Sequence, residues 1–142
     1  MHYHFVDETE FDRLIADGEM LEWAVVHGRH RYGTRSEPVR RILAEGRPAL
    51  LEIDLQGARQ IRQSMPTALF VFLRPPDFQE LVRRLVGRGT ESAEERARRL
   101  RTAEVEMAAE SEFDVSIVND DVQRATDELV SWMGLVPVQP RG

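Results

Sequence analysis

The residues from Leu21 to Thr34 include side chains whose types and spacing could bind a ligand. They read LEWAVVHGRHRYGT, an apolar run containing an acid, then a turn with a glycine, then Tyr-Gly-Thr. Glu22 could accept two hydrogen bonds from one edge of a planar base, Thr34 could donate to a carbonyl on the same ring, and Tyr32 could bond a phosphate oxygen. Because carboxylates only accept and hydroxyls can donate, this set fits guanine better than adenine. Taken alone, the stretch is better interpreted as a half-buried hairpin with one polar face.

A second set consists of arginines around a break rich in glycine. Arg84 lies at the end of one predicted helix, Arg88 lies between two glycines, and Arg99 lies on the following helix. Two helices joined in this way can form a lid on which the arginines converge, and a phosphoryl group in transfer would neutralise them. The alternative is a solvated helix with Glu–Arg pairs at i,i+4 spacing. We prefer that alternative for the remaining arginines of the segment, which are Arg83, Arg96, Arg98 and Arg101.

Two further candidate sites follow predicted buried strands. Glu52 and Asp54 share one face at the end of the apolar segment 48–54, and ligands of open α/β sheets bind outside the carboxyl ends of strands. This pair could hold a ribose hydroxyl and a hydrated magnesium ion, or Asp54 could instead cap the next helix. Asn119 follows the segment 115–118, and its amide could read a base edge, although Asn-Asp also begins turns.

The composition narrows the classes of partner. The chain has 142 residues, a net charge of −6, no cysteine, and 19 basic residues that are all arginine. The negative charge argues against a nucleic-acid partner, and no apolar run approaches the roughly 20 residues that span a bilayer. The histidines lack a convincing third ligand, so we expect no metal site built from them. We therefore expect a cytoplasmic protein, in which any phosphate clamp must be built from guanidinium groups because lysine is absent.

Predicted strands and helices alternate along the chain. Helices are expected over 8–16, from a Ser36 cap to Gly46, over 56–64, over 78–86, from a Ser92 cap to about 112, and over 122–133. Strands are expected over 21–27, 31–33, 48–54, 68–73 and 115–118. This alternation predicts an α/β protein with a mostly parallel sheet.

Seven segments together resemble guanylate kinase in type, order and spacing, from Tyr3 to about Met133. They are Tyr3–Val6, Leu21–Trp23, His27–Thr34, Glu52–Gly57, Gly87–Glu91, Arg98–Leu100 and Val118–Asp120. The resemblance implies a three-layer parallel-sheet core of the P-loop kinase type, a small nucleoside-monophosphate-binding subdomain and a helical lid. It implies one domain over 1–142, with GMP bound by 1–35, the core formed by 36–83 and 100–142, and the lid formed by 84–99.

The resemblance also implies an activity and roles for single residues. The family transfers the γ-phosphoryl group of ATP to GMP with Mg²⁺, giving ADP and GDP. On the GMP side, Tyr3 and Tyr32 would hold the phosphate, Glu22 and Thr34 would read guanine, and Gly33 and Glu52 would complete the GMP contacts. On the ATP side, Asp54 would face the metal and phosphates, Arg84, Arg88 and Arg99 would clamp phosphates, and Asn119 would contact adenine.

The sequence departs from the family pattern in two respects, of which the smaller is Glu52 at a position where the family usually has Asp. The family begins with a strand, a P-loop of the form G-x-x-x-x-G-K-[ST] and a helix, and these 142 residues contain no such motif and no lysine. We expect a fragment of a longer protein with very low catalysis by itself. The alternative is a homo-oligomer or a partner that covers the missing strand. A second hypothesis is a catalytically inactive, guanylate-kinase-like module that binds proteins.

Overall fold

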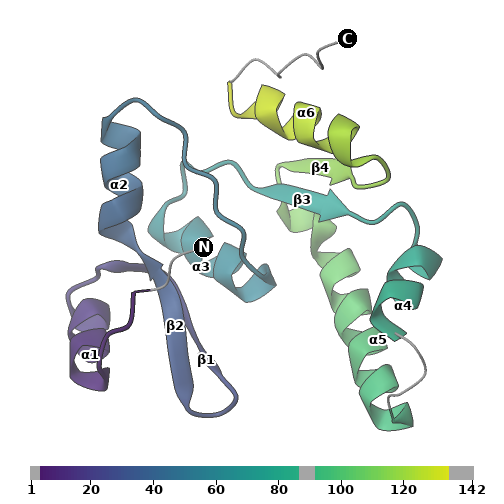
Figure 1. Ribbon diagram of the computed structural model, residues 1–142, viewed down its shortest axis with the longest axis horizontal. Coiled ribbons are helices and arrows are strands. Elements are labelled where there is room, and N and C mark those ends of the chain that lie inside the picture. The colour runs from purple at the N-terminus through teal and green to yellow at the C-terminus, as the bar shows by residue number, and fades with distance from the viewer. Residues whose placement is uncertain (1–3, 87–91, 135–142) are drawn as a thin grey trace. The chain divides into compact units, whose positions relative to one another are not determined.

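The computed structural model describes residues 4–86 and 92–134, which form parts of two compact units (Figure 1). The first unit is Met1–Ala68 and the second is Leu69–Gly142. Each unit combines helices with one pair of strands, so the predicted mixture of α and β elements is confirmed. The division into a GMP-binding part, a core and a lid stays a prediction.

The first unit begins with helix α1 (Glu8–Ala16). Its start is set locally, because the Asp7 carboxylate accepts from the backbone N–H of Glu10 at 2.7 Å. Phe11 and Leu14 form the buried side of the helix, and the Phe11 ring lies edge-on to Trp23 at 6.2 Å between ring centroids. The predicted helix over 8–16 is confirmed, and it covers one face of the hairpin that follows.

Strands β1 (Met20–Val26) and β2 (His30–Arg35) pair antiparallel, as the sequence predicts. The turn between them contains His27 at φ 52° and Gly28 at φ 74°. Two consecutive residues with positive φ are typical of the type I′ turns whose twist matches that of a hairpin. The turn therefore fixes the register in which Glu22 faces Thr34.

Helix α2 (Ser36–Ala44) follows β2 directly. The prediction that Ser36 caps this helix is wrong: the N-cap residue is Arg35, with no side-chain cap bond, and Ser36 is already helical. The physical reason is tertiary, because the Ser36 backbone N–H donates to Glu19 O at 2.8 Å and continues the strand contact. The predicted stop is confirmed by Gly46 at φ 77°, just after the helix.

Segment 48–54 forms no hydrogen-bonded strand, so the prediction of a buried strand there is wrong. Leu50 is 62% exposed, and the segment leads directly into helix α3 (Leu55–Ser64). An apolar sequence supplies strand propensity, but a ladder also needs a neighbouring strand. Within the described residues, no strand pairs with this segment.

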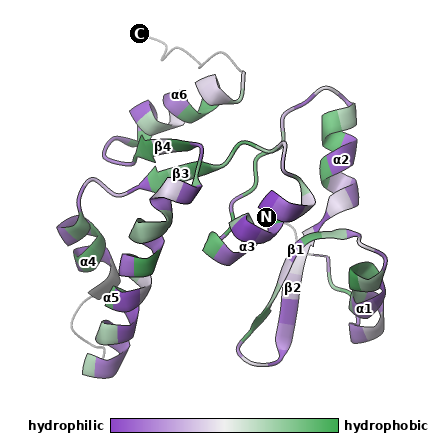
Figure 2. Ribbon diagram, turned by 180° about the vertical axis from the view of Figure 1, so that it is seen from behind, coloured by the Kyte–Doolittle hydropathy of each residue, from purple (hydrophilic) through white to green (hydrophobic). Residues whose placement is uncertain are grey.

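The second unit is built on two parallel strands, β3 (Val71–Arg74) and β4 (Val115–Val118). Both are largely apolar, and Figure 2 shows them mostly in green. Helices α4 (Phe78–Val86) and α5 (Ala93–Ala108) lie side by side, and α6 (Val122–Trp132) packs on β4 (Figure 1). The predicted long helix ends in a 3₁₀ turn, η1 (Ala109–Glu112). Ile117 and Ala103 lie at the centre of the core of this unit.

Candidate functional site

Glu22 and Thr34 lie directly opposite each other on β1 and β2. The Thr34 hydroxyl donates to Glu22 Oε1 at 2.8 Å, and only 5% of the Glu22 surface is exposed. A buried carboxylate is costly unless its oxygens accept hydrogen bonds. The structure thus brings together the two side chains that the sequence analysis predicts to read guanine. An additional hydrogen-bond donor to the buried Glu22 carboxylate would be stabilising.

The second oxygen of Glu22 lies against the start of α3. A Cβ atom built on Gly57 would lie 3.2 Å from Glu22 Oε2 and 3.3 Å from Asp54 Oδ1. Among the residues that the structure describes, Oε2 accepts no hydrogen bond. The N-terminus of a helix favours negative charge, and Gly57 lies in the first turn of α3. Glu22 therefore offers one unsatisfied acceptor beside the first turn of α3.

Tyr32 and Gly33 have different roles in the hairpin. Tyr32 lies opposite Ala24, on the same face as the Glu22–Thr34 pair, and is 43% exposed. A Cβ atom on Gly33 would lie 2.4 Å from the backbone oxygen of Glu22, so only glycine fits this close strand approach. The structure gives Gly33 a packing role, and its contact with GMP stays a prediction.

Asp54 is the N-cap residue of α3. Its Oδ1 accepts from the Gly57 backbone N–H at 2.8 Å, which confirms the capping alternative. Asp54 is exposed, and its Oδ2 has no hydrogen-bond partner in the described ranges. Glu52 is exposed and likewise makes no ion pair with a described residue. Both acids precede the helix whose first turn contacts Glu22, but they reach this position from an irregular segment rather than from a strand.

The arginine positions lie in the second unit, where only part of the prediction can be followed. Arg84 is half exposed, and its Nε lies 3.5 Å from Glu80 Oε1. Arg83 pairs with the same glutamate at 3.3 Å, in agreement with the solvated-helix interpretation preferred for that residue. Arg99 is exposed on α5 and has an interaction partner. Arg88 lies outside the described residues, as does Tyr3 of the first unit.

Asn119 lies where the parallel strands end. Its backbone N–H donates to Arg74 O at 2.7 Å, so the ends of β3 and β4 meet at one edge. Sequence reasoning missed Arg124, which donates to Val118 O at 2.6 Å and forms an ion pair with Asp120. The Arg124 guanidinium lowers the pKa of Asp120. The i,i+4 spacing of Asp120 and Arg124 in the sequence was the signal that could have identified this ion pair.

Arg31 was also missed, and it stabilises the opposite face of the hairpin. Its guanidinium lies 4.6 Å from the centroid of Phe11 and pairs with Glu8 at 2.6 Å and Asp12 at 2.7 Å. The hydrogen bond to Asp12 is the main cause of the raised pKa of Arg31. These contacts hold β2 against α1, which supports the hairpin from the face away from Glu22.

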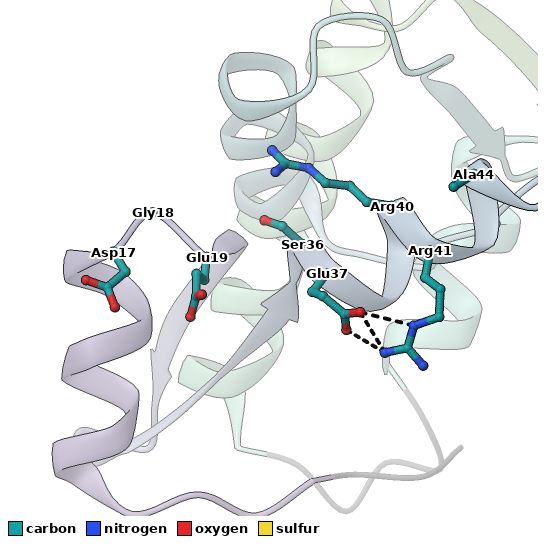
Figure 3. A pocket seen from close by; sticks show the side chains of 8 residues that line it. All are labelled: Asp17, Gly18, Glu19, Ser36, Glu37, Arg40, Arg41 and Ala44. Carbon is teal, nitrogen blue, oxygen red and sulfur yellow. Dashed lines mark hydrogen bonds and ion pairs between the residues drawn. The ribbon is translucent and has the colours of Figure 1, made fainter.

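A hollow of about 530 Å³ lies elsewhere in the first unit (Figure 3). The Glu37 carboxylate at its rim accepts three hydrogen bonds from the Arg41 guanidinium, the shortest at 2.6 Å. The lining residues are Asp17, Gly18, Glu19, Ser36, Glu37, Arg40, Arg41 and Ala44, and none of them is a predicted site residue.

The described part of the chain contains no group of three or more His, Cys, Asp or Glu arranged to hold a metal, and no helix there could cross a membrane.

Comparison with known proteins decides the family. The family model described as guanylate kinase matches residues 1–134. The chain belongs to the guanylate kinase family. A protein of Thermobifida fusca named guanylate kinase is 60% identical over 139 residues, which cover 98% of this chain and 70% of that protein. One of Leifsonia xyli with the same name is 55% identical over 141 residues, covering 99% of this chain and 56% of that protein.

Solved structures agree with this assignment. The crystal structure of guanylate kinase from Anaplasma phagocytophilum matches with a TM-score of 0.68 and 31% identity, over 93% of this chain and 63% of that one. The resemblance inferred from the sequence is thereby confirmed, as is the α/β fold class. The chain spans between 56% and 70% of the length of these three relatives.

Proposed function

We propose that this protein binds GMP on the Glu22–Thr34 face of the hairpin and acts in the transfer of the γ-phosphoryl group from ATP to GMP. The observation that carries the proposal is the buried Glu22 carboxylate, with one oxygen on Thr34 and the other free of described donors. Guanine presents two adjacent N–H donors, which match the two carboxylate oxygens. The family of the chain supports the same activity.

The Thr34 hydroxyl would change its partner when the base binds. In the structure its proton is directed to Glu22, so it does not yet point to a ligand. Once the N–H groups of guanine satisfy the carboxylate, the hydroxyl can rotate and donate to the guanine carbonyl. Tyr32, exposed on the same face, would bond the phosphate, and Tyr3 and Glu52 are proposed as further GMP contacts.

For the ATP side we propose roles that follow the family resemblance. Arg84, Arg88 and Arg99 would neutralise the transferring phosphoryl group, and Asn119 would contact adenine. Mg²⁺ bound to phosphate oxygens would reduce their charge, and the open Oδ2 of Asp54 is an oxygen of the type that Mg²⁺ accepts. Asp54 Oδ1 would meanwhile keep its bond to the α3 backbone and hold the carboxylate in place.

The test is a calorimetric titration of the full chain with GMP, with AMP as the matched ligand. We expect saturable heat with GMP and none with AMP, whose base edge offers one donor beside an acceptor. Glu22→Gln keeps the side-chain volume and should weaken GMP binding by roughly tenfold to a hundredfold, because a charge-assisted pair is lost. Equal heats for GMP and AMP would refute the proposal. Binding of a phosphopeptide without GMP binding would identify a protein-binding module instead.

A further inference from the structure

Helix α3 holds the backbone on both sides of Glu22. The Gln60 side chain accepts from the Trp23 backbone N–H at 2.9 Å and donates to the Trp23 carbonyl at 2.9 Å. One turn later, the Ser64 hydroxyl donates to the Leu21 carbonyl at 2.8 Å. The two residues that flank Glu22 are therefore anchored to the same helix by three hydrogen bonds.

The two hydrogen bonds of Gln60 resemble those that a neighbouring strand would make. Trp23 lies opposite Gly33 on β2, yet its own N–H and C=O bond to Gln60, on the outer edge of β1. An isolated two-stranded hairpin is only marginally stable in water, and its edge can slip or fray. The Gln60 amide satisfies the backbone N–H and C=O groups on this edge at Trp23, the residue next to Glu22.

The same face of α3 also contacts the Glu22 side chain. Gly57 and Gln60 are separated by one helical turn, so both face β1, and Gly57 lies against Glu22 Oε2. Ile61, next to Gln60, is 3% exposed and packs this face into the unit. Carboxylate and backbone of Glu22 are thus both placed by one helix, whose N-cap is Asp54.

We propose that Gln60 is a positioning residue that fixes the Glu22 carboxylate for reading guanine. The proposal rests on the proposed function of Glu22 and extends it to a residue that touches no ligand. A binding site requires its groups to be held within about 0.5 Å of the productive geometry. A strand such as β1 does not hold its side chains this closely when it is hydrogen-bonded along only one of its two edges. Loss of the Gln60 bonds should therefore weaken recognition of the base through Glu22.

The test compares Gln60→Met with Gln63→Met in the full chain. Both substitutions replace a glutamine of α3 with an apolar side chain of similar length, but Gln63 is exposed and forms no hydrogen bond to a described residue of β1. With GMP as titrant, we expect Gln60→Met to raise Kd about tenfold, as for the loss of hydrogen bonds that are each modest in net strength. Gln63→Met should leave Kd unchanged.

A double-mutant cycle separates positioning from a general loss of structure. If Gln60 acts through Glu22, then Gln60→Met should weaken GMP binding in the native background but change it little in the Glu22→Gln background. An equal loss in both backgrounds, or an equal loss from Gln63→Met, would overturn the proposal. Should Gln60→Met fail to fold, Gln60→Glu replaces it in the cycle, because it keeps the acceptor for the Trp23 N–H and lacks the donor.

Hydrogen exchange at the Trp23 amide distinguishes failure of this inference from failure of the proposed function. We expect this amide to be protected in the native chain and to exchange about tenfold faster in Gln60→Met, but not in Gln63→Met. If the native chain binds no GMP, the proposed function fails, and the positioning role fails with it. If GMP binds but Trp23 exchange is unchanged by Gln60→Met, the inference alone is wrong.

Discussion

The two compact units hold their candidate site residues in different ways. In the first unit, Glu22 is buried and bonded to Thr34, and its neighbour Trp23 is bonded to Gln60, 37 residues further along the chain. In the second, Arg84 is half exposed and pairs with Glu80, one turn away on the same helix. The difference is that Glu22 is held by residues distant in sequence, whereas the ion pair of Arg84 is made within its own helix.

The largest effect should come from the closest packing in the hairpin. Gly33→Ala would place a Cβ atom 2.4 Å from the Glu22 backbone oxygen, so we expect a loss of about 3 kcal/mol in unfolding free energy. Gly18→Ala is the control, because φ there is 67° but nothing lies within 4 Å, and it should cost only about 1 kcal/mol. Urea unfolding measures the unfolding free energy of both variants. Equal losses of unfolding free energy would contradict the close packing of the strands at Gly33.

The helix caps of the two units provide the next comparison. Asp54→Ala removes a partly buried bond of 2.8 Å at the start of α3 and should cost about 1 kcal/mol. Ser92→Ala removes an exposed bond of 3.2 Å at the start of α5, and its smaller cost should be about 0.5 kcal/mol. Thermal unfolding followed by circular dichroism would show the difference. A larger loss from Ser92→Ala would reverse the comparison.

Arg84→Gln should hardly change stability, by less than about 0.5 kcal/mol, because an exposed ion pair at i,i+4 spacing contributes little. If the proposed function is correct, the same variant should lower GDP formation from ATP and GMP while GMP affinity stays the same. The rate of GDP formation should be measured on a form of the protein that catalyses this reaction. Arg83→Gln, on the same helix, is the control. A change in GMP affinity as large as the change in rate would contradict the assigned role.

The smallest expected effect is a pH dependence in the second unit. The hydrogen bond from Arg124 lowers the pKa of Asp120 below its ordinary value of 3.8. Because the folded pKa is depressed, this pair stabilises the fold above pH 3.8, and the contribution disappears as pH falls further through the folded pKa. Arg124→Gln should flatten that part of a stability profile measured between pH 5 and 2. An unchanged profile would show that the exposed pair contributes nothing.

Much of the fold could be predicted because the deciding signals are local. The starts of α1 and α3 follow from Asp7 and Asp54, each of which caps the backbone three residues later. The hairpin follows from alternating residues around a turn with Gly28 at positive φ. Segment 48–54 was mispredicted for the opposite reason, since an apolar run does not determine whether a strand lies beside it.

The sequence by itself determined the starts of α1 and α3, the presence of the hairpin and the resemblance to the guanylate kinase family. Only the tertiary structure decided that Glu22 is buried, that Gly33 is fixed by the neighbouring backbone, and that Gln60 bonds to Trp23. The physical reason is the sequence separation of the interacting residues. Caps and turns are completed within a few residues, whereas the burial of Glu22 and the hydrogen bonds on the outer edge of β1 depend on segments that only folding brings together.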